Sequence, residues 1–251
     1  MLQSFTKLAL VFLLAFSSLN AFSQDTPPVK QAVAANNLLQ EAYNFTDKLY
    51  YDTIQTGASI YKGEEYVFYS FRIDGDPFFY SDESDLGDIR YGGILYKNIE
   101  YRYDIYLKKL VVAHNKLSYN ICIDTAMVDY FKLHDHQFYK LDADSSGTIK
   151  HGFYDMLVDG DTKLYAKRSK SLQKEIENQQ VHEWFDVEDK YFLYKDGVYY
   201  KVKKKGSLLK VLKNQKKALK SHIKSERIKF KKSPENGLIQ TVNYYNKLLQ
   251  Q

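Results

Sequence analysis

The feature that most constrains the fold is a close series of short aromatic and β-branched segments between residues 65 and 141. The first predicted strand covers residues 65–73 and is ended by Gly75-Asp76-Pro77, and residues 91–94 form a tight turn around Gly92 and Gly93. Strands joined by such short turns pair antiparallel, which predicts a meander in a barrel-like or sandwich sheet. Five further strands are expected at residues 99–107, 110–114, 117–123, 128–133 and 137–141.

The second half of the chain mixes hairpins and helices. Strands at 153–158 and 163–166 flank Asp159-Gly160-Asp161, and strands at 191–194 and 198–202 flank a turn that contains Gly197. The polar residues 170–180 between these hairpins indicate a helix or a long loop.

Two helices are expected to close the chain. One is capped by Ser207, and the other starts with Ser233 and Pro234. With an amphipathic helix predicted over residues 30–45, the fold class is α+β.

The first 23 residues have the pattern of a cleaved export signal. Lys7 precedes an apolar run over residues 8–16 that is too short to span a bilayer, and Ala21 and Ser23 occupy the −3 and −1 positions. We therefore expect export through the Sec pathway, cleavage after Ser23, and a periplasmic or outer-membrane-associated protein without a transmembrane segment. The single cysteine, Cys122, excludes an internal disulfide and is expected to be a small buried hydrophobe.

Charge divides the mature chain near residue 150. Residues 24–150 carry a net charge of −6, whereas residues 151–251 carry +10, and residues 195–232 alone carry +13. We therefore distinguish a signal peptide (1–23), an acidic region (24–150) and a basic region (151–251). Such asymmetry indicates either complementarity within the chain or a basic surface for an anionic partner.

Five lysines in the basic region recur at helical spacing. On a helix from Ser207 they would form one stripe, which is either a solvated face or a contact for lipid head groups, lipopolysaccharide or the acidic region. Because an exported protein does not meet nucleic acid routinely, nucleic acid is not an expected partner. The stripe consists of Lys210, Lys213, Lys217, Lys220 and Lys224.

Three other patterns could carry chemistry, but each has a simpler explanation. Asp142, Asp144 and Ser146 imitate the start of a calcium loop, yet position 12 is Phe153, which supplies no carboxylate. An acidic surface turn is the favoured interpretation, and no metal or cofactor is expected.

Histidines and acids give the other two patterns. His134 and His136 could share a strand face and join a metal site, but surface histidines are favoured. The acidic residues within 74–88 could supply paired carboxylates for glycoside hydrolysis, although their Gly, Ser and Pro neighbours favour an exposed loop.

Several runs resemble a family of uncharacterised exported proteins of Gram-negative bacteria. They are residues 93–96, 103–105 and 110–112, residues 152–160, and a C-terminal pattern of Ile228-Lys229-Phe230-Lys231, Glu235 and Tyr244-Tyr245-Asn246. The resemblance covers most of the mature chain and implies a Gram-negative envelope location. It implies no activity, because the family has none assigned.

The sequence therefore predicts a non-enzymatic cell-envelope protein that binds a protein or an anionic envelope partner. The alternative is a hydrolase that acts on an envelope polymer or peptide through carboxylates of the loop 74–88. Sequences typical of nucleotide-binding loops, zinc proteases and serine hydrolases do not occur, so no reaction is indicated.

Overall fold

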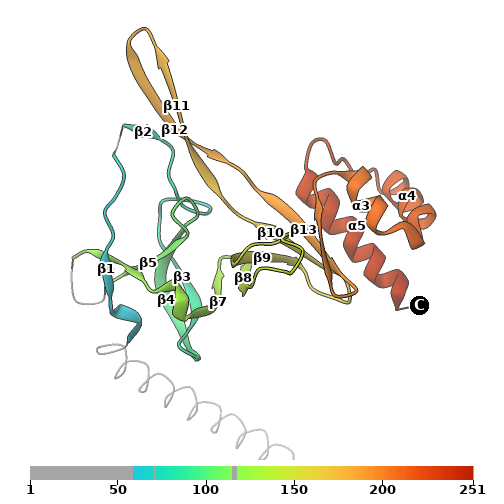
Figure 1. Ribbon diagram of the computed structural model, residues 1–251, viewed down its shortest axis with the longest axis horizontal. Coiled ribbons are helices and arrows are strands. Elements are labelled where there is room, and N and C mark those ends of the chain that lie inside the picture. Colours follow the sequence, from blue (N-terminus) through green and yellow to red (C-terminus); the bar gives the residue numbers. More distant parts are fainter. Residues whose placement is uncertain (1–58, 71, 115–117, 251) are drawn as a thin grey trace, which may run out of the picture. The chain divides into compact units, whose positions relative to one another are not determined.

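A computed structural model describes residues 59–70, 72–114 and 118–250 of the chain. Its main element is an eleven-stranded sheet in the order β1-β6-β5-β4-β3-β7-β8-β9-β10-β13-β14, in which every neighbouring pair is antiparallel (Figure 1). Its strands are β1 (Gly63–Glu65), β3 (Asp85–Tyr91), β4 (Ile94–Asp104), β5 (Lys109–Ala113), β6 (Asn120–Ile123), β7 (Val128–Leu133), β8 (His136–Leu141), β9 (Gly152–Val158), β10 (Lys163–Lys167), β13 (Lys190–Lys195) and β14 (Val198–Val202).

The expected antiparallel meander is confirmed, but barrel-like closure is wrong. The sheet is open, with β1 at one edge and β14 at the other. The turns fall where glycine allows a left-handed backbone, as at Gly92 (φ 58°) and Gly197 (φ 79°). The sheet also continues through residue 150, since β8 pairs with β9 there, so the change of charge does not interrupt it.

Aromatic side chains fill the core of the first half. Tyr101 and Tyr103 are buried, and Phe131 stacks on Phe138 with ring centroids 4.6 Å apart. Cys122 is also buried and has a free thiol. The tyrosines of β4 therefore contribute to packing, and each buried aromatic ring removes roughly 150–250 Å² from water.

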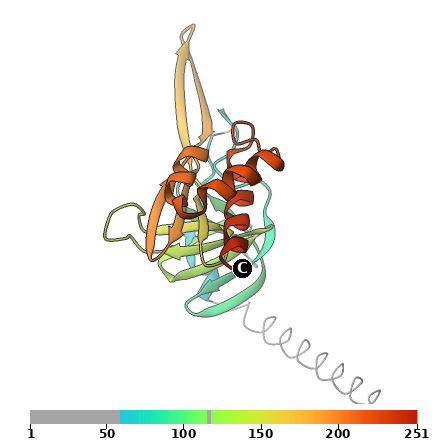
Figure 2. The same ribbon diagram turned by 90° about the vertical axis from the view of Figure 1, so that its right-hand side faces the viewer.

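Helices cover one face of the other end of the sheet (Figure 2). They are α3 (Lys205–Val211), α4 (Lys216–Ser225) and α5 (Pro234–Leu249), and α5 begins with proline at its first position as predicted. The single helix expected from Ser207 is wrong, because it breaks at Leu212 into a 3-10 turn (Lys213–Gln215) before α4. Leu212 and Leu219 both belong to the core between helices and sheet, which contains Leu164 and Leu193 of the sheet.

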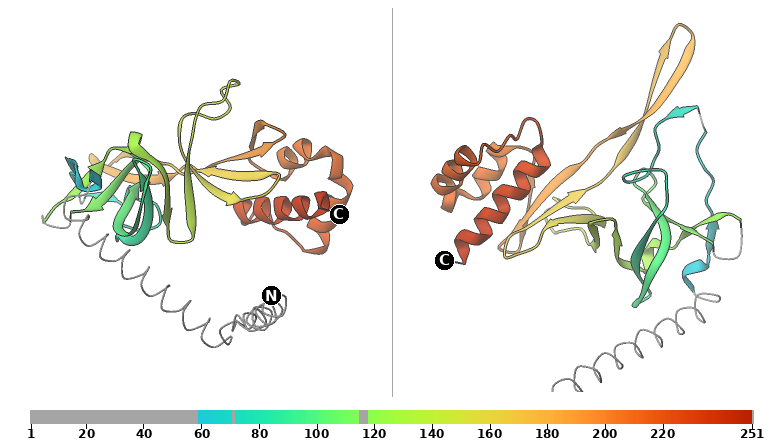
Figure 3. Two further views of the ribbon diagram at one scale, coloured as in Figure 1. Left: turned by 90° about the horizontal axis from the view of Figure 1, so that it is seen from below. Right: turned by 180° about the vertical axis from the view of Figure 1, so that it is seen from behind.

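A second, three-stranded sheet contains β11 (Lys170–Glu177), β12 (Gln180–Val187) and β2 (Ile73–Asp74), and β2 pairs with β12 in parallel. The strands β11 and β12 form a long hairpin (Figure 3, right). The helix or loop expected for residues 170–180 is therefore wrong. Along β11, Leu172 and Ile176 have polar sequence neighbours. Because successive side chains of a strand point to opposite faces, the two apolar side chains lie on one face of the ribbon and their polar neighbours on the other.

The strand expected over residues 65–73 is also mostly wrong. Of the described residues in that segment, only Glu65 and Ile73 belong to strands; Tyr66 packs in the core, and its amide donates to the Asn120 carbonyl (2.8 Å). The Tyr66 hydroxyl donates to buried Asp104 (2.8 Å), and the Arg102 guanidinium lies over the rings of Phe68 and Phe78.

Some expectations fall outside the described residues. They are the export signal with its cleavage site and the helix over residues 30–45. Within the described ranges, none of the helices combines the length and the hydrophobicity needed to cross a membrane.

Candidate anion-binding site

The site begins at the end of β10, where the neighbouring basic residues Lys167 and Arg168 serve opposite faces of the sheet. Ala166 lies opposite Asp155 of β9, and Arg168 binds that same aspartate. Because successive side chains of a strand alternate between faces, Tyr165 and Lys167 lie on the face away from the helices. The two cations therefore meet very different surroundings.

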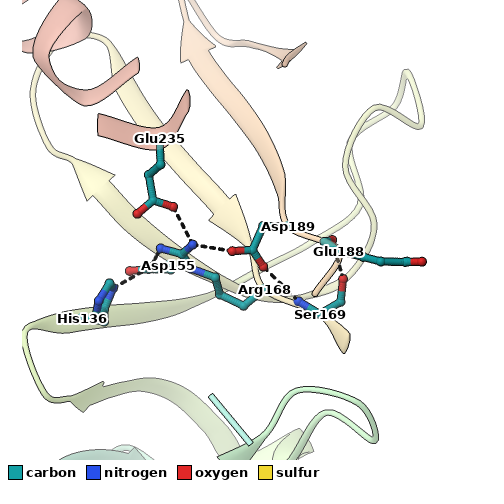
Figure 4. Close-up of polar contacts among 7 residues, drawn as sticks. All are labelled: His136, Asp155, Arg168, Ser169, Glu188, Asp189 and Glu235. Atoms are coloured by element: carbon teal, nitrogen blue, oxygen red, sulfur yellow. Dashed lines mark hydrogen bonds and ion pairs between the residues drawn. The ribbon is translucent and has the colours of Figure 1, made fainter. Parts of the chain in front are cut away.

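Arg168 lies at the centre of a buried network (Figure 4). Its Nε and Nη2 donate to Asp155 Oδ2 (2.9 and 2.6 Å), and its Nη1 donates to Asp189 Oδ2 (2.6 Å) and Glu235 Oε2 (2.5 Å). The His136 Nδ1–H donates to the same oxygen of Asp155 (2.7 Å). The network ties β8, β9, the ends of β10 and β13, and the first turn of α5.

Charged partners affect the pKa of Arg168 more than burial does, although its side chain is only 6 % exposed. Burial alone would lower the pKa of its guanidinium, but the hydrogen bond that it donates to Glu235 and the charges of Asp155, Glu235 and Asp189 raise that pKa. Charge-assisted, two-pronged pairs of this kind fix geometry as well as energy. Arg168 is thus a structural cation that holds the end of β10 in place.

The opposite face carries a cavity of about 560 Å³ that is lined by lysines. Two aromatic side chains and two hydroxyl residues complete the wall, and no acidic residue is among the described residues that line it. The cavity, called here the lysine cavity, is lined by Lys108, Lys150, Lys167, Lys190, Lys201, Tyr154, Phe192, Gly147, Thr148 and Ser169.

Strand pairing brings these lysines together. Lys167 of β10 lies directly opposite Lys190 of β13, and Lys201 of β14 lies opposite Phe192 one step along the same face. Like charges directly opposite each other on neighbouring strands destabilise a sheet. The arrangement is therefore unfavourable by itself and calls for an anion.

Tyr154 orients the half-buried Lys167. The Lys167 Nζ lies 4.9 Å from the centre of the Tyr154 ring and donates to its hydroxyl (3.3 Å), and that hydroxyl donates to the carbonyl of Lys150 (2.8 Å). Burial lowers the pKa of Lys167, and the charges of Lys108, Lys150 and Lys190 lower it further. A bound oxyanion would reverse the effect of these charges.

The five lysines of the predicted stripe lie elsewhere. Because the helix breaks at Leu212, they are divided among α3, the 3-10 turn and α4, and all five side chains are exposed. Neither cavity described here is lined by any of them. They remain a predicted contact surface rather than a formed site.

The calcium-like segment folds on itself. Ser146 Oγ donates to the Asp144 carboxylate, which also accepts from the Ile149 amide (2.8 Å), while Asp142 pairs with His151 (3.0 Å). Across the described ranges, no group of three His, Cys, Asp or Glu side chains is arranged to hold a metal ion.

The two histidines predicted to lie at the surface have separate partners. His134 pairs with Asp85 (2.6 Å), whereas His136 belongs to the Arg168 network. His134 lies in the turn between β7 and β8 (φ 52°), and both imidazoles lie beside the ring of Tyr80, with centroids 4.5 and 6.4 Å away.

The acidic residues of the loop 74–88 are likewise engaged one by one. Asp76 accepts from the Phe78 amide (2.7 Å) and pairs with Lys170 (3.1 Å), and the Asp88 carboxylate accepts from the Asn98 amide (3.4 Å). None of these contacts brings two carboxylates of the loop to one point, so they do not favour the hydrolase alternative.

Sequence reasoning missed both the Arg168 network and the lysine cavity. The hairpin around Gly197 was expected, and its register places Lys201 beside Phe192. The pairing of β10 with β13 was not visible, because the inserted hairpin β11–β12 separates these strands in sequence.

Comparison with protein-family models, with curated proteins and with solved structures gives no match.

Proposed function

We propose that this chain is an exported, non-enzymatic envelope protein that binds an anionic envelope partner, and that the lysine cavity receives the anionic group. The observation that carries the proposal is the convergence of five lysines on one cavity without an acidic residue in its described wall. Lysine supplies a compact charge with three donors, and it is a common ligand for phosphate. A phosphate-bearing partner such as a lipid head group or lipopolysaccharide fits this chemistry.

Energetics support a binding role over a purely structural one. The nearby lysines oppose one another, and burial already lowers the pKa of Lys167. A bound phosphate would replace this repulsion by attraction, and it would stabilise the fold by mass action. The other lysine of β10, Lys163, has a carboxylate partner in Asp159 (2.5 Å).

Calorimetry with inorganic phosphate tests the proposal. The wild-type chain is expected to bind phosphate with an affinity that falls as salt rises, and the double variant Lys167→Met/Lys190→Met is expected to bind at least tenfold more weakly. The matched control is Lys217→Met/Lys220→Met on α4, which removes the same charge from the exposed stripe. Equal binding by the two double variants, or no binding by the wild type at millimolar phosphate, would overturn the proposal.

A further inference from the structure

A smaller cavity of about 300 Å³ adjoins the lysine cavity. Lys108 and Lys167 line both, so these two side chains mark the boundary between them. Whereas the larger cavity offers mainly cations, the smaller one offers a mixture of donors, acceptors and rings. Its remaining wall consists of Tyr103, Asp124, Thr125, Ala126, Lys140, His151, Gly152, Phe153 and Arg168.

One wall of this smaller cavity is a rigid turn. Asp124 caps the 3-10 turn Thr125–Met127 by accepting from the Ala126 amide (2.9 Å). From β8, the Lys140 Nζ donates to the carbonyls of Thr125 (3.2 Å) and Ala126 (2.6 Å). The Ala126 amide therefore holds the Asp124 carboxylate beside the cavity, and Lys140 holds the backbone of Thr125 and Ala126.

The rest of the wall combines rings with further hydrogen-bonding groups. Tyr103 and Phe153 meet edge to face, with centroids 6.2 Å apart, and both belong to the core. His151 also lines the cavity and is paired with Asp142. Rings beside convergent donors and acceptors suit a ligand that has an apolar ring face and several hydroxyl groups.

The charge of Asp124 distinguishes the two cavities. A second phosphate in the smaller cavity would meet this carboxylate, and like charges at close range repel. A neutral hydroxyl group would instead donate to it. The size of the cavity, near the lower end of the roughly 300–1,000 Å³ usual for small-molecule sites, suits a single ring.

We infer that the anionic partner carries a neutral, polyhydroxylated ring with one phosphate, as in a sugar phosphate. The ring occupies the smaller cavity, and its phosphate passes between Lys108 and Lys167 into the lysine cavity. The inference rests on the proposed function, since it assumes that the lysine cavity binds phosphate. A free sugar phosphate and a phosphorylated glycolipid share this chemistry.

Calorimetry with three soluble probes tests the inference. Glucose 1-phosphate is expected to bind about tenfold more tightly than inorganic phosphate, because the ring adds contacts, and pyrophosphate is expected to lack that gain. Asp124→Ser keeps a good helix-capping side chain but removes the carboxylate. This variant is expected to bring the affinity for glucose 1-phosphate within twofold of that for inorganic phosphate.

The matched control is Asp129→Ser, which removes an exposed carboxylate from β7 and is expected to change neither affinity. If inorganic phosphate binds but glucose 1-phosphate gains nothing, the inference is wrong and the proposed function stands. The inference is also overturned if pyrophosphate binds more tightly than glucose 1-phosphate and binds the Asp124→Ser variant more tightly still. That result would identify a site for polyanions. Failure of all three probes would remove the proposed function itself.

Vesicles distinguish the two sources of the sugar phosphate. Binding to vesicles that contain lipid A, competed by free glucose 1-phosphate, would support a glycolipid partner. Binding of glucose 1-phosphate alone, with none to the vesicles, would support a free sugar phosphate.

Discussion

Lys167 and Arg168 are adjacent, carry the same charge and lie at the end of the same strand, yet their polar partners differ completely. Arg168 is surrounded by three carboxylates and hydrogen-bonded to each of them. Lys167 faces Lys190 across the sheet and contacts the ring and hydroxyl of Tyr154. The alternation of a β-strand separates the two environments by one residue.

The difference separates structural charge from charge kept for a ligand. A buried cation that serves the fold has its partners built in, because an unpaired buried charge is strongly unfavourable. A group of cations without such partners lowers the stability of the fold. Locally unfavourable arrangements of this kind are typical of functional sites. The same contrast predicts that substitutions at these two neighbours change stability in opposite directions.

The largest effect is expected for Arg168→Met. Removing the guanidinium leaves Asp155, which is 1 % exposed, without its main partner, and breaking a buried pair in this way costs about 3–5 kcal/mol. Urea unfolding should show this loss in the free energy of unfolding. Arg90→Met, at an exposed position of β3, is the control and is expected to change stability by less than about 1 kcal/mol. A loss below about 1 kcal/mol for Arg168→Met would show that the network does not hold the fold.

Much of the fold could be predicted because its signals are local. The strand at 128–133, the strand at 198–202 and the start of α5 at Pro234 follow from alternation, turn glycines and capping residues close by in sequence. The site could not be predicted in this way. Glu235 and Arg168 lie 67 residues apart, and nothing local marks their contact.

The errors have the same origin. The lysine stripe was inferred from regular spacing on one helix, but that helix breaks at Leu212 and the stripe is divided among α3, the 3-10 turn and α4. Conversely, the lysines of the cavity are scattered from Lys108 to Lys201 and show no periodicity in sequence. The pairing of β10 with β13 sets Lys167 opposite Lys190, the pairing of β13 with β14 adds Lys201, and Lys108 and Lys150 come from segments outside the strands.

A smaller effect of opposite sign is expected for Lys167→Met. Removing one of two like charges that face each other across β10 and β13 should raise the free energy of unfolding by up to about 1 kcal/mol. Lys163→Met is the matched control on the same strand and face, and it should slightly lower stability because Lys163 is paired with Asp159. Denaturant unfolding of the two variants without phosphate measures both changes. If both lysines behave alike, Lys167 is not repelled by its neighbours.

The smallest effect is the pH dependence of the increase in the free energy of unfolding that Lys167→Met produces. Burial and the neighbouring lysines lower the pKa of Lys167 in the folded state, so between that pKa and the ordinary value of 10.5 the unfolded chain binds more protons than the folded one. The wild type therefore recovers stability as pH rises through this window. The advantage of the variant should be complete below the folded pKa and should vanish above about 10.5, where Lys167 is neutral in both states.

Unfolding of both proteins from pH 7 to pH 11 measures this convergence. Burial raises the pKa of tyrosines such as Tyr165 in the folded state. At alkaline pH their hydroxyls therefore lose protons first in the unfolded chain, and this lowers the stability of the folded state. That effect is common to both proteins and cancels in the difference between them. Saturating phosphate should shift the convergence to higher pH, since a bound anion stabilises the charged form of Lys167. If the difference in the free energy of unfolding between the two proteins stays constant up to pH 11, the added stability of the variant came from burying the methionine side chain and not from removing a charge that other lysines repel.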